Sequence, residues 1–178
     1  GVMRVPDADQ REIVSLGSFT PAPGGRYLVG TVSGEQEGFE AGYSKTIGST
    51  RDLVILDRVS NTIVRLLGRT DQVILSWSYP VADGEKPVDP SMLLVTLVDA
   101  DSNGDKRLDG ADRRTLLACL PSGADCKPLL AGIDSVLTQS VRADGRVDLV
   151  TSANGTIQWR VIAVDRALGD AIAIPDSK

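Results

Sequence analysis

Glycine-containing turns recur in this chain about 60 residues apart, and they constrain its fold more than any other feature of the sequence. They are Ala22-Pro23-Gly24-Gly25-Arg26, Val81-Ala82-Asp83-Gly84-Glu85 and Arg142-Ala143-Asp144-Gly145-Arg146, each between two runs rich in Val, Ile and Leu. Short apolar runs bounded by Gly, Pro, Asn or Asp are typical of β-strands. Self-similarity at this period indicates repeated units that stack or are arranged radially.

The rest of the chain fits an all-β fold of antiparallel strands. We predict strands at residues 26–32, 53–57, 62–67, 73–79, 92–98, 136–141, 146–151 and 157–164. Only residues 111–120 are ambiguous between helix and strand. We divide this single domain of 178 residues into three four-stranded units, at about 11–69, 70–132 and 133–178. Each unit is predicted as strand, glycine turn, strand, connection, strand, turn and strand.

The connection after the second strand varies from unit to unit. We predict a long loop over residues 34–50 in the first unit, residues 99–112 in the second, and a tight Asn154-Gly155 hairpin turn in the third. Insertions at one equivalent point of a repeat lie on one face, where binding loops are often found. The aromatic residues of 34–50 either form such a loop or fold back on the core.

Three short motifs carry a family resemblance: Arg26-Tyr27-Leu28-Val29 after a glycine turn, Leu56-Asp57-Arg58, and Leu66-Leu67-Gly68. Together they resemble blades of TolB-type β-propellers over most of the chain, although Ala-Pro-Gly-Gly-Arg departs from the commoner Pro-Asp-Gly-Lys. The resemblance implies a bacterial envelope or secreted protein that binds a partner and performs no catalysis.

Three blade-like units do not close a propeller, since four to eight are typical, and open ends leave unpaired strand edges. Three arrangements follow. Two chains form a homodimeric ring of six units, the chain belongs to a longer one, or the strands form a β-sandwich or an open barrel.

The sharpest local pattern is Asp101-Ser102-Asn103-Gly104-Asp105-Lys106-Arg107-Leu108-Asp109-Gly110-Ala111-Asp112. It matches the twelve-residue EF-hand loop, in which alternate oxygen ligands converge on Ca²⁺. The predicted ligands are Asp101, Asn103, Asp105, the backbone carbonyl of Arg107, Asp109 and Asp112. Leu108 takes the apolar position that holds the loop to the core. We expect a strand on both sides, so that the ion rigidifies a hairpin.

Two departures from the EF-hand pattern predict weak affinity. Lys106 stands where a sharp turn normally requires Gly with a positive φ, and Asp112 replaces a longer, bidentate Glu. A left-handed Lys costs roughly 1 kcal/mol. Asp-ended loops of this type resemble those of dockerins and of calcium inserts in bacterial propellers. The expected dissociation constant is about 10⁻⁴–10⁻³ M.

Composition excludes several function classes. The chain has no His, which removes the commonest general base and zinc ligand, and its net charge of −5 disfavours nucleic-acid binding. No apolar run approaches the length of about 18 residues that a membrane span needs. No export signal is visible at the start; we expect that one, if it exists, was removed.

The two cysteines, Cys119 and Cys126, flank turn-forming residues, which favours a disulfide and therefore a periplasmic or secreted location.

We therefore expect a non-catalytic, calcium-binding scaffold for an unknown protein or glycan. Trp77 and Trp159 lie on predicted strands, where they either pack in the core or stack on sugar rings. The alternatives are a carboxylate-dependent hydrolase, for which no motif singles out an acid pair, and a purely structural fragment.

Overall fold

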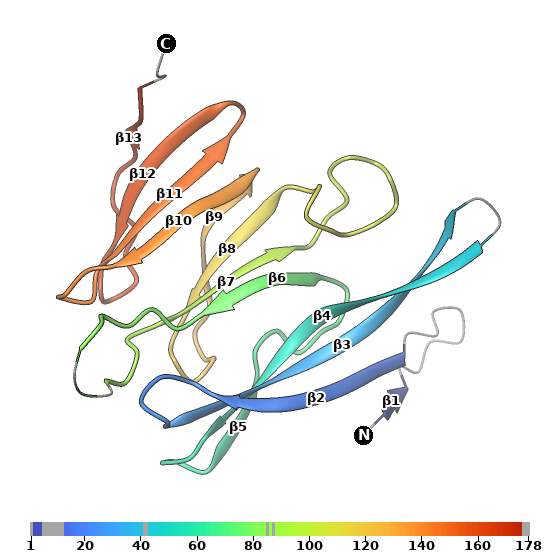
Figure 1. Cartoon of the computed structure of the whole chain (residues 1–178), viewed down its shortest axis with the longest axis horizontal. Coiled ribbons are helices and arrows are strands. Elements are labelled where there is room, and N and C mark those ends of the chain that lie inside the picture. The colour runs from blue at the N-terminus through green and yellow to red at the C-terminus, as the bar shows by residue number, and fades with distance from the viewer. Residues whose placement is uncertain (1, 5–12, 41–42, 85, 87, 176–178) are drawn as a thin grey trace.

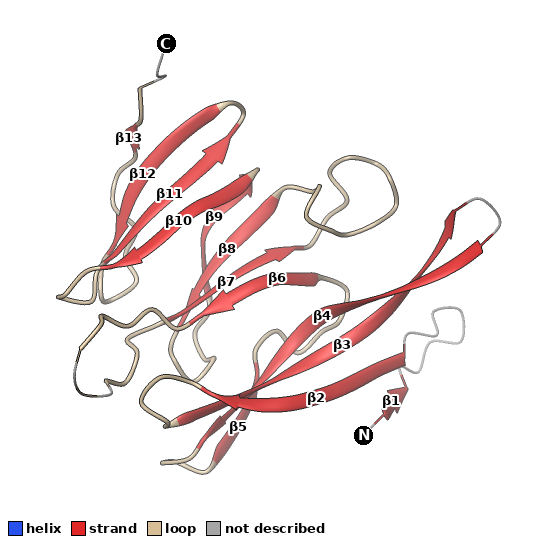
Figure 2. Cartoon of the chain, in the orientation of Figure 1, coloured by secondary structure: helices blue, strands red, loops and turns tan. Residues whose placement is uncertain are grey.

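A computed structural model of the chain describes residues 2–4, 13–40, 43–84, 86 and 88–175. In this structure every strand pairing is antiparallel, and the strands form three open sheets that pack face to face in chain order (Figures 1 and 2). The predicted all-β, blade-like class is confirmed. The β-sandwich and open-barrel alternatives are wrong, because three sheets pack in series and each sheet has a linear strand order.

The first sheet has the order β1-β2-β3-β4-β5, with β1 as a short strand added to a four-stranded unit. Its strands are β1 (Val2–Arg4), β2 (Ile13–Pro21), β3 (Tyr27–Glu40), β4 (Tyr43–Asp57) and β5 (Thr62–Arg65). The second sheet contains β6 (Val73–Ser78), β7 (Leu93–Val98), β8 (Arg114–Cys119) and β9 (Lys127–Ile133). The third contains β10 (Ser135–Val141), β11 (Val147–Ala153), β12 (Thr156–Ile162) and β13 (Ile172–Ala173).

The repeated turns occupy equivalent places, each joining the first and second strands of a four-stranded unit. In two of them the same hydrogen bond closes the turn: the Gly25 N–H donates to the Ala22 carbonyl at 3.0 Å, and the Gly145 N–H to the Arg142 carbonyl at 2.9 Å. Gly25 and Gly145 both have positive φ, of 75° and 90°, which explains why glycine stands there.

The long loop predicted over residues 34–50 is wrong. β3 and β4 continue through this segment as one ladder, with register pairs that extend to Glu40 and Tyr43. Its Gly and Glu residues weaken strand propensity, but continuous pairing with the neighbouring strand supplies the backbone hydrogen bonds. Residues 41–42 lie outside the described residues.

The core lies in two layers, one on each side of the second sheet. All six residues of β7 are buried, because alternate side chains face opposite neighbours. Leu93, Val95 and Leu97 pack with residues of the first sheet such as Leu53. Leu94 packs with residues of the third sheet, including Leu149 and Ile162. The sequence Leu-Leu-Val-Thr-Leu-Val is thus nearly all apolar because both faces of this strand are covered.

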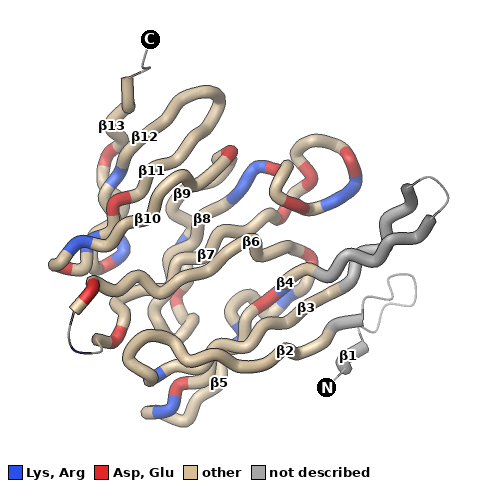
Figure 3. The backbone as a smooth tube through the Cα atoms, in the orientation of Figure 1, with Lys and Arg blue, Asp and Glu red and all other residues tan. Residues whose placement is uncertain are grey.

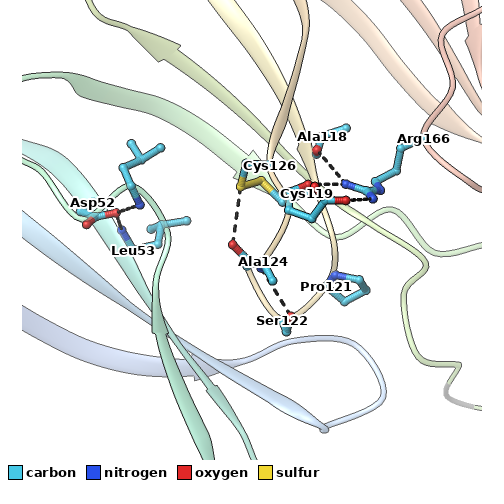
Figure 4. Close-up of a disulfide and its surroundings, with 12 residues drawn as sticks. Asp52, Leu53, Ala118, Cys119, Pro121, Ser122, Ala124, Cys126 and Arg166 are labelled. Carbon is cyan, nitrogen blue, oxygen red and sulfur yellow. Dashed lines mark hydrogen bonds and ion pairs between the residues drawn. A yellow bond between two sulfur atoms is a disulfide. The ribbon is translucent and has the colours of Figure 1, made fainter.

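The predicted disulfide between Cys119 and Cys126 is present and closes the β8–β9 hairpin (Figure 4). The hairpin between them contacts neighbouring elements through polar groups. The hydroxyl of Tyr79 donates to the Pro121 carbonyl at 2.9 Å. Arg166, which follows β12, points its guanidinium at the same hairpin and donates to the Ala118 carbonyl (Figure 4).

Candidate metal centre

The acidic loop at residues 101–112 connects β7 and β8 and projects beyond the sheet (Figure 1). The flanking residues form strands on both sides, as expected, and the helix alternative for residues 111–120 is wrong. The equivalent connection in the third sheet is the two-residue turn of Asn154 and Gly155, whose φ values of 51° and 76° fit the predicted tight hairpin. The loop is therefore an insertion at the tip of a hairpin that is otherwise short.

Three carboxylates of the loop converge. One oxygen from each of Asp101, Asp105 and Asp112 lies within 4.8 Å of the other two. Oxygens that share one Ca²⁺ at 2.3–2.6 Å lie no more than about 5 Å apart, so this spacing fits a single ion. Without a cation, three like charges at this separation repel one another. Figure 3 shows acidic and basic residues gathered together on this loop.

The loop backbone holds these oxygens in place. The two oxygens of Asp101 accept hydrogen bonds from the N–H groups of Gly104 and Lys106, both at 2.8 Å. The Asp105 carboxylate accepts from the Arg107 N–H at 2.9 Å. These short-range bonds curl the chain around one point, and the acid-rich spacing of the sequence is what allows them.

Asp112 anchors the far end of the loop. It is only 2% exposed, and its two oxygens accept from the N–H groups of Ser102 at 2.9 Å and Asp109 at 3.0 Å. Burial acts to raise the pKa of Asp112, but the hydrogen bonds from Asp109, Ser102 and Asn103 outweigh it and hold that pKa below the ordinary value. The carboxylate is therefore ionised at neutral pH, which is the form that coordinates a hard cation.

Lys106 adopts the left-handed conformation that its loop position predicts, with a φ of 65°. This conformation aims its N–H at Asp101 and so tightens the loop. The backbone therefore follows the EF-hand path at this position even though the residue is not Gly.

The other predicted ligands lie beside the three-carboxylate group. The Asn103 side-chain oxygen accepts from the Asp105 N–H at 3.1 Å, within the same curl. The Asp109 carboxylate accepts from the Ala111 N–H at 2.9 Å and is not one of the three converging groups. Direct or water-mediated coordination by Asp109, and by the Arg107 carbonyl, stays a prediction. Leu108 is half-buried at its predicted apolar position.

Sequence reasoning missed Ser102. Its hydroxyl accepts from the Arg113 N–H at 2.8 Å and lies 3.4 Å from Asp112, so it joins the two ends of the loop. The available signal was a hydroxyl residue directly after the first aspartate, a type that bonds readily to nearby backbone.

The two tryptophans have different settings. Trp77 is partly buried and packs against the core between the first and second sheets, which supports its core role. Trp159 is half-buried on β12 and donates its indole N–H to Asp148 at 2.9 Å.

No protein-family model matches the sequence, and no curated protein matches it. Among solved structures, one similar chain comes from the crystal structure of the tricorn protease, at 12% sequence identity and a TM-score of 0.27. The match covers 90% of this chain and 23% of that one, so the chain spans less than a quarter of the protein it resembles.

Proposed function

We propose that the chain is a non-catalytic β-repeat module, stabilised by one calcium ion, that serves as a scaffold for a protein or glycan partner in the bacterial envelope or outside the cell. The observation that carries this proposal is the convergence of Asp101, Asp105 and Asp112 within a loop of EF-hand spacing. The resemblance of the repeats to TolB-type blades, and of the loop to those of dockerins, supports the same class.

A structural role for the ion follows from where the loop is attached. β7 and β8 lie in the middle of the second sheet, and most of their residues are buried. An ion that fixes both ends of the connection rigidifies the central hairpin of the molecule. The loop lies between two paired strands, so binding orders this connection without opening a groove.

The location is supported by the Cys119–Cys126 disulfide, because disulfides persist mainly in oxidising compartments. The described part of the chain contains no helix that is long and apolar enough to cross a membrane. For the partner, the support is positional: β3–β4, the calcium loop and the β11–β12 turn all reach toward one side of the molecule (Figure 1). Insertions that lie on one side of a repeat protein often form its binding face.

One cavity among the described residues bears on the hydrolase alternative. A cavity of about 280 Å³ lies between the second and third sheets, and its polar lining consists of hydroxyl, amide and guanidinium groups. Lining residues include Ser76, Thr96, Arg114 and Gln139, and the lining contains no Asp or Glu. A glycoside hydrolase needs two carboxylates across such a space.

Thermal unfolding in EDTA and in excess Ca²⁺ tests the calcium proposal. With a dissociation constant near 10⁻⁴ M, 10 mM Ca²⁺ stabilises the folded state by about 2.7 kcal/mol, which raises the melting temperature by several degrees. The same concentration of Mg²⁺ should have a smaller effect, since Mg²⁺ demands stricter geometry. An unchanged melting temperature in saturating Ca²⁺ contradicts the proposal.

Matched variants locate the site. Asp101→Asn and Asp105→Asn keep a side-chain acceptor for the loop backbone but remove one charge each, so they should lose most of the calcium-induced shift. Asp83→Asn removes one charge from an exposed turn outside the loop and should retain the full shift. An equal loss in all three variants would indicate a general charge effect in place of a site.

A further inference from the structure

The three sheets of the chain form two junctions of the same kind. The second sheet packs one face on the first sheet and its other face on the third. The first and third sheets stand at the ends of this series, so each has one face that packs inward and one that faces away (Figure 2). The polarity of the side chains on these two outward faces indicates whether another sheet packs on them.

On β12 of the third sheet, the outward side is more apolar than the side that faces the second sheet. Alternation along β12 places Gln158 and Arg160 on the same side as Ile162, which packs against the second sheet. Ile157, Trp159 and Val161 therefore lie on the side that faces away. An antiparallel sheet with one solvated face normally carries polar residues there, and β12 has the reverse pattern.

Neighbouring strands extend this surface. Register pairs place Val150 beside Trp159 on one side and Ile172 beside it on the other, and Ile174 is hydrogen-bonded to Ile157. Ile172 is 55% exposed and Ile174 42% exposed. We name this surface the third-sheet open face; its apolar residues are Val150, Ile157, Trp159, Val161, Ile172 and Ile174. Asp148 and Ser152, the register partners of Val161 and Ile157, lie on the same face.

The first sheet has a matching surface. Leu53 and Ile55 of β4 face the second sheet, so Val54 and Leu56 between them face away. Leu56 pairs with Leu28 of β3 and with Ile63 of β5, and Ile63 is 71% exposed. We name this surface the first-sheet open face; it consists of Phe19, Leu28, Val54, Leu56 and Ile63.

Phe19 belongs to this face because its ring occupies the space beside Gly30. A Cβ atom built on Gly30 would lie 2.7 Å from the Phe19 ring, so only glycine permits the contact. The outward face of the first sheet therefore carries these apolar side chains next to Arg65, which is the register partner of Val54 and forms an ion pair with Asp52. Exposed apolar residues rimmed by polar ones are typical of interaction sites.

We propose that two copies of the chain associate so that the third-sheet open face of each packs on the first-sheet open face of the other. Within the chain, the first sheet packs on one face of the second sheet, and the third sheet packs on the opposite face. Each junction therefore joins the face of one sheet that is directed toward the C-terminal sheets to the face of the next sheet that is directed toward the N-terminal sheets. The two open faces are the two halves of one further junction of that kind, so a second copy supplies a complementary face at each end. Two copies supply six sheets, which lies within the range of four to eight for closed radial arrangements of four-stranded sheets. A two-fold axis generates both new junctions and leaves no apolar face uncovered.

Sedimentation velocity and light scattering from micromolar to submillimolar concentration test the proposal on the chain with its disulfide intact. The expected result is a discrete species of twice the mass of one chain. A monomer throughout this range overturns the proposal. A ladder of larger species overturns it as well, since head-to-tail contacts that fail to close form open polymers.

Variants test the faces themselves. Ile63→Asp on the first-sheet open face and Ile172→Asp on the third-sheet open face should each give monomers. An equimolar mixture of the two should regain association, because one of the two junctions in the mixed dimer has both faces intact. Val59→Asp, at a turn residue that is also 71% exposed but lies outside both faces, should remain dimeric. Mixed variants that stay monomeric would contradict the specific pairing of these two faces.

Discussion

The guanidinium of Arg166 lies 2.7 Å from the carboxylate of Asp125, and this ion pair ties the third sheet to the disulfide hairpin of the second. Arg166 is only 8% exposed and also donates to the carbonyls of Ala118 and Asp125. The same hairpin meets the first sheet at Gly123, where an added Cβ would lie 2.7 Å from the Cδ1 of Ile55. One hairpin therefore contacts all three sheets.

Arg166→Ala should destabilise the protein strongly. The change removes a charged donor and leaves the buried Ala118 carbonyl without its guanidinium partner, which costs about 2–3 kcal/mol in the free energy of unfolding. Urea denaturation measures this loss. Arg58→Ala, at an exposed position of the β4–β5 turn, is the control and should change stability by less than about 0.5 kcal/mol. Equal effects of the two substitutions would show that Arg166 does not join the sheets energetically.

Reduction of the Cys119–Cys126 disulfide should lower stability by about 2 kcal/mol, because the bond closes a short loop and constrains the unfolded chain. The measurement is thermal unfolding with and without a reductant. The Cys119→Ala/Cys126→Ala variant should match the reduced protein and show no response to reductant. A variant that still responds would place the effect of the reductant elsewhere.

The local patterns of the sequence predicted most of the strands and the backbone path of the loop at residues 101–112. They did not predict the interactions between segments that are distant in the sequence. Lys106 illustrates the first case, because the spacing of the ligands alone required its left-handed backbone. Asp52 illustrates the second: it is fully buried, accepts from the N–H groups of Leu67 and Gly68, and pairs with Arg65 at 3.0 Å. No local pattern marks such a residue, because these partners lie on β5 and in the segment that follows it.

The predicted loop at residues 34–50 failed for a related reason. Propensity treats each segment alone, whereas β3 and β4 stabilise each other by pairing. The Arg166 contact was equally invisible, since sequence patterns do not reveal which turn of one sheet meets which hairpin of another.

Lys106→Gly should stabilise the loop and tighten calcium binding. Gly adopts a positive φ without the steric cost of a Cβ, and the cost removed is roughly 1 kcal/mol. Isothermal titration with Ca²⁺ should show a several-fold smaller dissociation constant. Lys106→Ala removes the charge but keeps the Cβ, so it separates the two effects. If Ala and Gly improve affinity equally, the charge of Lys106 and not its backbone conformation limits binding.

Acidification should destabilise the protein below about pH 4, because several aspartates have a lower pKa in the folded state than in the unfolded chain. The two hydrogen bonds from Arg142, with the indole N–H of Trp159, lower the pKa of Asp148 to about 2. Hydrogen bonds from Arg26 lower the pKa of Asp57 in the same way. A lowered folded-state pKa means that the stabilisation is fully present above the unfolded pKa near 3.9 and is lost as the pH falls toward the folded value.

Asp148→Asn tests how much the Asp148 carboxylate contributes to the loss of stability at acidic pH. Asn keeps an acceptor for the indole but loses the ion pair with Arg142, so the variant should be less stable at neutral pH and should lose less stability on acidification than the unmodified chain. Trp fluorescence during urea unfolding at a series of pH values measures both differences. Asp165→Asn, an exposed position in the turn after β12, should follow the unmodified chain at every pH. If Asp148→Asn and the unmodified chain lost stability in parallel from neutral pH down to pH values near 2, the Arg142–Asp148 pair would not be a source of the acid sensitivity.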